Sequence, residues 1–143
     1  MERAKVLFVC VKNSARSQMA EALLNHVAGD RFQAESAGLE PGTLNPLAIA
    51  AMNAMNIDIS NKGTRDVFDI WRKGGIFNYV ITVCDETSGE RCPLFPGVTE
   101  RLHWSFDAPA TFTGTQEEKL AKTIKVRDQI REKIQTWIHE HNP

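Results

Sequence analysis

Consecutive residues near the N-terminus combine a nucleophile with groups that could bind an anion. They read Cys10-Val11-Lys12-Asn13-Ser14-Ala15-Arg16-Ser17 and lie between an apolar run and a segment of helical periodicity. The start of a helix presents unpaired N–H groups and a partial positive charge, so a loop placed there can hold a phosphate-like anion. The planar guanidinium of Arg16 can bind two oxygens of such an anion at once. The segment therefore predicts a binding loop for a tetrahedral oxyanion.

The same groups would act on the thiol of Cys10. A helix N-terminus and an arginine both favour thiolate over thiol, and the thiolate is the nucleophile. Ser17 could donate a hydrogen bond to the sulfur, and Asn13 tolerates the left-handed backbone that a tight loop needs. We predict that Cys10 and Arg16 are catalytic. The candidate substrate-binding residues are Lys12, Asn13, Ser14, Ala15, Arg16 and Ser17. In the alternative interpretation Cys10 is a small buried hydrophobe and Arg16 an ordinary surface residue.

The elements that would position this loop follow from apolar patterns. The run Ala4 to Val9 is typical of a strand buried on both faces of a parallel sheet. Apolar residues at helical spacing from Ala15 to Val27 predict a helix that ends at Gly29. Further strands are predicted over Phe32–Ser36, Tyr79–Val83 and Leu102–Ser105.

Helix start signals mark the remaining helices. Asn45 and Pro46 predict an N-cap and a first helical residue, with the helix running through Met55. A short helix is predicted over 66–72, and Thr115 with Glu118 has the spacing of a capping box that opens a long closing helix. Strands that alternate with helices predict an α/β fold with a parallel sheet, in which ligands bind at the carboxyl ends of the strands.

Size and charge limit the class of protein. With 143 residues, 42% hydrophobic and 24% charged, the chain is predicted to form a single domain over 1–143. The formal charge of −1 argues against a nucleic acid or an anionic membrane as partner. The apolar run Val6 to Val11 is too short for a signal peptide or a membrane span, so we expect a cytoplasmic protein. We also expect it to act as a monomer.

Two further cysteines lie in and beside a polar segment. Cys84 directly follows the predicted strand Tyr79–Val83, and Cys92 comes after an intervening stretch of polar residues. Gly and Pro between Cys84 and Gly97 predict a mobile loop. A reducing compartment disfavours structural disulfides, which leaves packing, metal binding or redox chemistry. A metal site with His103 is disfavoured because no C-x-x-C spacing is present.

The stretch CVKNSARSQMAEA, residues 10–22, resembles the active-site loop of the low-molecular-weight protein tyrosine phosphatase family. The similarity continues through Ser36-Ala37-Gly38, Asn45-Pro46 and 56–60 and covers most of the chain. The resemblance implies three layers, with a central four-stranded parallel sheet flanked by helices. Two groups of enzymes share this fold, the phosphatases and the thioredoxin-coupled arsenate reductases. The Cys84 and Cys92 pair and the HWSF segment, 103–106, resemble those of the reductases.

This resemblance implies an arsenate reductase that serves arsenic detoxification. Cys10 would attack arsenate to form a covalent arseno-cysteine, and Cys84 would then attack the Cys10 sulfur, releasing arsenite and leaving a Cys10–Cys84 disulfide. Cys92 would next attack Cys84, and thioredoxin would reduce the resulting Cys84–Cys92 disulfide. Arsenate and thioredoxin are thus the expected partners, and no resident cofactor is required.

The resemblance also implies a general acid and an ion. The family usually places an aspartate directly before a proline, but here Ala108 precedes Pro109, so Asp107 becomes the candidate acid; an ordinary surface carboxylate is the alternative. Some reductases of this type hold a potassium ion. The positions that match its oxygen ligands are Asn13, Glu21, Ser36 and Asp66, although these side chains could equally hydrogen-bond one another.

Other functions stay open at this stage. A low-molecular-weight tyrosine phosphatase would act through a phospho-Cys10 intermediate, although Ala15 stands where many phosphatases carry a second cysteine. A non-catalytic oxyanion or redox sensor is a third class, which no feature of the chain supports. Turnover with thioredoxin, and its dependence on Cys92, would separate an arsenate reductase from a phosphatase.

Overall fold

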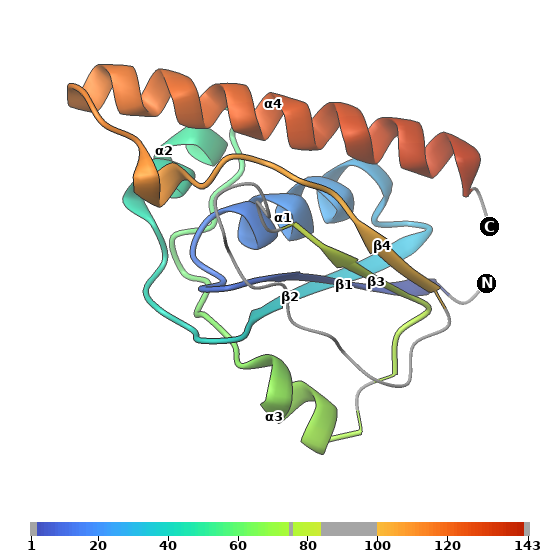
Figure 1. The fold of residues 1–143 in the computed structure, drawn as a ribbon. Coiled ribbons are helices and arrows are strands. Elements are labelled where there is room, and N and C mark those ends of the chain that lie inside the picture. The colour runs from blue at the N-terminus through green and yellow to red at the C-terminus, as the bar shows by residue number, and fades with distance from the viewer. Residues whose placement is uncertain (1–2, 75, 84–99, 142–143) are drawn as a thin grey trace.

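Four parallel strands form the centre of the molecule (Figure 1). The structure is a computed structural model that describes residues 3–74, 76–83 and 100–141. The strands are β1 (Ala4–Cys10), β2 (Phe32–Gly38), β3 (Tyr79–Thr82) and β4 (Glu100–His103). Their order across the sheet is β2-β1-β3-β4, and every neighbouring pair is parallel. The predicted α/β class and four-stranded parallel sheet are confirmed.

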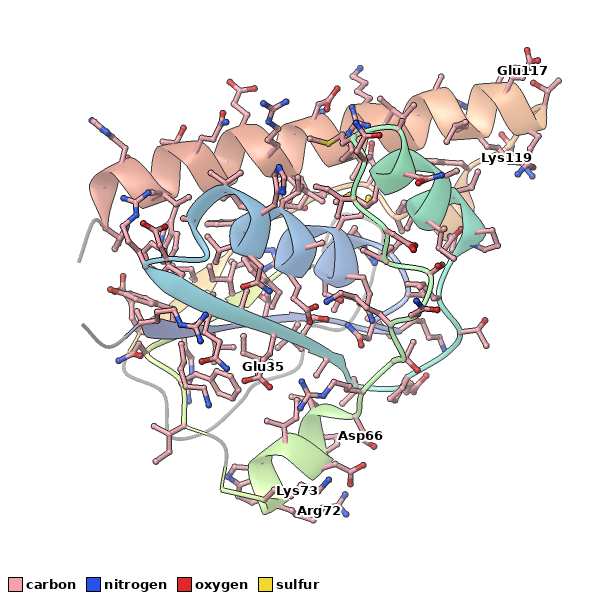
Figure 2. All side chains as sticks on the ribbon, turned by 180° about the vertical axis from the view of Figure 1, so that it is seen from behind. Glu35, Asp66, Arg72, Lys73, Glu117 and Lys119 are labelled. Carbon is pink, nitrogen blue, oxygen red and sulfur yellow. The ribbon has the colours of Figure 1, made fainter. Side chains whose placement is uncertain are left out.

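Helices cover both faces of this sheet. The helices are α1 (Arg16–Ala28), α2 (Pro46–Asn53), α3 (Val67–Arg72) and α4 (Gln116–Glu140). Figure 1 shows α1, α2 and α4 on one face of the sheet and α3 on the other, which gives the three layers. Figure 2, seen from behind, shows Asp66 where α3 begins and Lys73 where it ends, on the opposite side of the sheet from Glu117 in α4.

The side chains of β1 alternate between two hydrophobic cores. Val6 and Phe8 pack in the larger core with α1 and α4, whereas Leu7 and Val9 pack with α3 in the smaller one. All four side chains are fully buried. This burial on both faces explains why β1 is a continuous apolar run rather than an alternating one.

Side-chain caps set the starts of three helices. Asn45 accepts a hydrogen bond from the backbone N–H of Leu47 at 2.8 Å, with Pro46 as the first residue of α2. Thr115 and Glu118 form the predicted capping box of α4. Asp66, predicted within the short helix, is instead the N-cap of α3, because its carboxylate accepts from Phe68 N.

The fourth strand lies two residues earlier than predicted. The sequence favoured Leu102–Ser105, whereas β4 spans Glu100–His103 and pairs Glu100 with Tyr79. This strand lies at the sheet edge and is largely exposed, so its position is determined by backbone pairing rather than by an apolar pattern. The predicted loop from Cys84 to Gly97 lies outside the described residues.

Among the described residues, no helix combines the length and apolar character that a membrane crossing requires.

Candidate active site

The loop predicted to bind an oxyanion connects β1 to α1 at the carboxyl end of the sheet. Cys10 is the last residue of β1, and Arg16 is the first residue of α1. Both are nearly inaccessible, with exposed fractions of 2% and 5%. The N-cap of α1 is Ala15, whose methyl side chain offers no capping oxygen. The predicted placement of a cysteine and an arginine at a helix start is therefore confirmed.

The carbonyl groups of this loop point away from its centre. They accept hydrogen bonds from the segment that follows β2: Leu39 N to Cys10 O at 3.2 Å, Glu40 N to Val11 O at 2.8 Å, Gly42 N to Lys12 O at 3.0 Å and Asn45 N to Ser14 O at 2.8 Å. The peptide bonds of the loop are trans. Across a trans peptide, the C=O of one residue and the N–H of the next point in opposite directions. The N–H groups that follow these four carbonyls, those of Val11, Lys12, Asn13 and Ala15, are thus directed to the inner side, where an anion would bind.

Two donors converge on the sulfur of Cys10. The backbone N–H of Asn13 donates to Cys10 Sγ at 3.2 Å, and Ser17 Oγ lies 2.9 Å from the same sulfur. Asn13 Nδ2 donates to Ser17 Oγ at 2.7 Å. Because this contact uses Ser17 as an acceptor, the Ser17 hydroxyl hydrogen is available for the sulfur. Both hydrogens are therefore directed at the sulfur, the atom that would attack a bound anion.

The side chain of Asn13 is held by groups from beyond the loop. Its Oδ1 accepts from the backbone N–H of Arg65 at 2.9 Å and from Gln18 Nε2 at 3.1 Å. Gln18 Nε2 also contacts Asn13 O at 3.2 Å and Gly63 O at 3.1 Å. Asn13 itself has φ 53°, the left-handed conformation that the sequence predicted it to tolerate. The sequence analysis did not identify Gln18, Gly63 or Arg65. Gly63 and Arg65 lie far from the loop along the chain, whereas the position of Gln18 in the first turns of α1 was an available signal.

Gly38 lets β2 approach the loop closely. A Cβ atom at this position would lie 2.7 Å from Val11 O and 2.8 Å from Asn13 N, which are both backbone atoms. Contacts this short do not occur with real Cβ atoms, so only glycine fits without moving the loop. The Ser36-Ala37-Gly38 motif in the sequence was the available signal for this role.

The inner side of the loop opens into a cavity of about 110 Å³. Its lining residues are Cys10, Lys12, Ser14, Ala15, Arg16, Ala108, Pro109, Ala110 and Thr111. Arg16 Nη1 donates to Phe106 O at 3.2 Å, which ties the second half of this lining to α1. Four of the predicted substrate-binding residues thus line the cavity, whereas Asn13 and Ser17 hold the sulfur. Lys12 also pairs with Glu40 at 3.1 Å on the surface.

Of the other predicted catalytic residues, the structure describes only Asp107, which does not line this cavity. Asp107 lines a separate depression, together with Lys122 and Lys125. Cys84 and Cys92 lie outside the described residues. The roles of these three residues therefore stay predictions.

The residues matched to a potassium ion already contact protein groups. Ser36 Oγ donates to Glu21 Oε1 at 2.9 Å, and the Lys62 ammonium contacts Glu21 Oε2. Asn13 Oδ1 accepts two N–H donors, and Asp66 caps α3. An ammonium and a hydroxyl contact Glu21, two N–H donors contact Asn13, and Asp66 caps a helix, so the arrangement does not fit a potassium ion. Burial, and then Arg65, lower the pKa of Lys62, whereas the touching Glu21 carboxylate favours its charged form.

Comparison with known proteins finds relatives that share the description arsenate reductase. The arsenate reductase of Bacillus subtilis (strain 168) is 41% identical over 140 residues, covering 96% of each chain. That of Bacillus licheniformis is 42% identical over 139 residues, again covering 96% of each. Among solved structures, an arsenate reductase in the phosphate binding state has a TM-score of 0.79 at 28% identity and covers 96% of this chain and 98% of that chain.

A second solved structure is described as thioredoxin-dependent. This arsenate reductase of Corynebacterium glutamicum has a TM-score of 0.61 at 29% identity and covers 94% of this chain and 63% of its own. The family model for low molecular weight phosphotyrosine protein phosphatases matches residues 5–141. With its loop, its four parallel strands and these relatives in agreement, the chain belongs to the low molecular weight phosphotyrosine protein phosphatase family.

Proposed function

We propose that this protein reduces arsenate to arsenite, with Cys10 as the nucleophile. The observation that carries the proposal is the loop itself, in which a buried sulfur receives two donors beside a small cavity lined by Arg16. The geometry suits any tetrahedral oxyanion. The curated relatives, which are about 40% identical over nearly their full length, are named arsenate reductases. This favours arsenate as the substrate.

The first step joins sulfur to arsenic. The Cys10 thiolate attacks As(V), and one oxygen of arsenate leaves as water after protonation. Arg16 and the inward N–H groups stabilise the negative charge on the remaining oxygens. Asp107 is the proposed proton donor to the leaving oxygen, and a movement of the segment after Phe106 would be needed to bring it to the cavity.

The second step transfers two electrons. Cys84 attacks the Cys10 sulfur, the electron pair of the S–As bond stays on arsenic, and arsenite leaves behind a Cys10–Cys84 disulfide. Cys92 then attacks the Cys84 sulfur and releases the Cys10 thiolate. Thioredoxin reduces the Cys84–Cys92 disulfide by thiol exchange and thereby supplies the two electrons. A thioredoxin-dependent relative of the same fold supports this choice of reductant.

A coupled assay tests the proposal. Thioredoxin, thioredoxin reductase and NADPH are supplied, and NADPH consumption is followed after arsenate is added. We expect many turnovers for the wild type and none for Cys92→Ser, in which the Cys10–Cys84 disulfide should accumulate. Fast hydrolysis of an aryl phosphate that is indifferent to Cys84→Ser and Cys92→Ser would instead show a phosphatase.

A further inference from the structure

A buried carboxylate lies behind the oxyanion loop and does not take part in the proposed chemistry. Glu21, on α1, has an exposed fraction of 7%. Ser36 from β2 donates to one of its oxygens, and the Lys62 ammonium contacts the other. A buried charge without a partner is strongly unfavourable, so Glu21 requires a positive group at this place. Lys62 supplies it from the chain itself.

The segment that carries Lys62 also holds the loop. Gly63, the next residue, accepts from Gln18 through its carbonyl, and the backbone N–H of Arg65 donates to Asn13 Oδ1. Gln18 and Glu21 are one turn apart on α1, so their contacts fix the same segment against the same face of this helix. Contact between Lys62 and Glu21 therefore favours the position in which Asn13 is held.

Asn13 connects this segment to the nucleophile. Its backbone N–H donates to Cys10 Sγ, and its amide donates to Ser17, which leaves the Ser17 hydroxyl hydrogen for the same sulfur. A displacement of Asn13 would weaken both donors. Gln18 Oε1 is buried with no hydrogen-bond partner among the described residues. Because a buried polar atom without a partner costs stability, the contacts that Gln18 makes through its amide nitrogen are already partly offset.

We propose that Lys62 is a positioning residue that acts as a built-in cation, neutralising Glu21 so that the 62–65 segment holds Asn13, which in turn donates to Cys10. The proposal rests on Cys10 being the nucleophile of the proposed function. It implies that the wild-type protein needs no added monovalent cation. Without the ammonium, Glu21 and Ser36 would present oxygens that a potassium or ammonium ion could bind.

The test measures alkylation of Cys10 by iodoacetamide, which requires neither arsenate nor thioredoxin. All variants carry Cys84→Ser and Cys92→Ser, and the salt is choline, potassium or ammonium chloride at constant ionic strength and neutral pH. The wild-type rate should be the same in all three salts. Lys62→Met should react about fivefold more slowly in choline and recover in potassium or ammonium.

Two further variants make the result decisive. Glu21→Gln combined with Lys62→Met removes the charge that needs neutralising, so it should react faster than Lys62→Met in choline and show no salt response. Lys5→Ala removes a more exposed lysine paired with Glu35 at 3.7 Å and should match the wild type.

Three results would overturn the proposal. One is a wild-type rate that rises specifically with potassium, and another is a Lys62→Met rate equal to the wild type in choline. The third is a Lys62→Met defect, whether in reactivity or in folding, that neither an added cation nor Glu21→Gln relieves. Because alkylation is independent of turnover, failure of arsenate reduction in the coupled assay would leave this test intact and would be recognised separately.

Discussion

At the scale of single residues, Asn13 determines the direction of the hydrogen bond between Ser17 and the nucleophile. Asn13 Nδ2 can only donate, and it contacts Ser17 Oγ at 2.7 Å, so the serine hydrogen remains for Cys10 Sγ at 2.9 Å. The contact therefore gives the sulfur a hydroxyl donor in addition to the N–H of Asn13. Hydrogen bonds to a charged acceptor are stronger than those to a neutral one.

Removing this donor should reduce the reactivity of Cys10. Replacing Ser17 by Ala should slow alkylation of Cys10 at neutral pH about tenfold, the effect of losing one hydrogen bond to a charged group. The alkylation is quenched at successive times, and mass spectrometry of the quenched samples gives the rate. Ser60→Ala, an exposed serine bonded to Asp58, is the matched control and should have no effect. An unchanged rate in Ser17→Ala would show that the Ser17 hydroxyl does not contribute to the reactivity of Cys10.

The sequence indicated the residues within the loop but not the residues that support it. Cys10, Asn13, Arg16 and Ser17 could be identified because one local segment contains a nucleophile, donors and a helix start. Asn13 is supported by the backbone N–H of Arg65 and by Gln18, which also donates to the carbonyl of Gly63. Backbone groups carry no side-chain signature, so only the fold could reveal them.

At the scale of elements, the loop requires the end of β2 to lie very close to it. Gly38 pairs with Cys10 in the sheet, and the residues after it bind the outward carbonyls of the loop. The loop is therefore held against the segment that follows β2, and its shape depends on how closely the two can approach.

Adding one methyl group at this contact should disable the site. Gly38→Ala would place a Cβ 2.7 Å from Val11 O, so the loop must move, and a displacement of about 1 Å can cost on the order of a hundredfold in rate. The coupled arsenate assay measures the loss. Gly42→Ala, whose Cβ would meet Lys12 Cβ at an ordinary 3.9 Å, is the control. Full activity of Gly38→Ala would contradict the close approach.

The capping box of α4 should make stability depend on pH in the acid range. Hydrogen bonds from the backbone and then the side chain of Thr115 lower the pKa of Glu118 from its ordinary value of 4.5. A carboxyl whose pKa is lower in the folded state contributes stability above its unfolded pKa and loses it as the pH falls through the folded pKa. Glu118→Gln should therefore lower the urea midpoint at neutral pH.

The same variant should approach the wild type in acid. Below the folded pKa of Glu118 the carboxyl is protonated in both states, and the difference in urea midpoint should shrink. Glu117→Gln, in the same first turn but outside the capping box, should show a smaller pH-dependent difference. A Glu118→Gln effect that is constant across this range would show that the charge of Glu118 does not stabilise the cap.

Local signals explain which elements were predictable. β1 and α4 have strong apolar patterns, and Asn45 and Thr115 are caps whose side chains bond as the sequence suggested. β4 was displaced by two residues because an exposed edge strand shows no such pattern. Asp66 was assigned to a helix that it caps instead, a difference of one residue that only the bond to Phe68 N decides.

At the scale of the whole molecule, the fold places one loop where three independent features coincide. The sheet ends at Cys10, α1 begins at Arg16, and the segment after β2 holds the loop carbonyls outward. The parallel sheet was predictable from alternating strands and helices, and its four-strand size from the family resemblance. The outward carbonyls were not, since they depend on contacts between segments that are distant in sequence.

The most direct test of this account is whether an anion bound in the loop protects Cys10. With Cys84→Ser and Cys92→Ser in place, alkylation by iodoacetamide reports on Cys10 alone. We predict that Cys10 is alkylated at neutral pH and that arsenate or phosphate slows this reaction. An alkylation rate that neither anion changes would contradict the account.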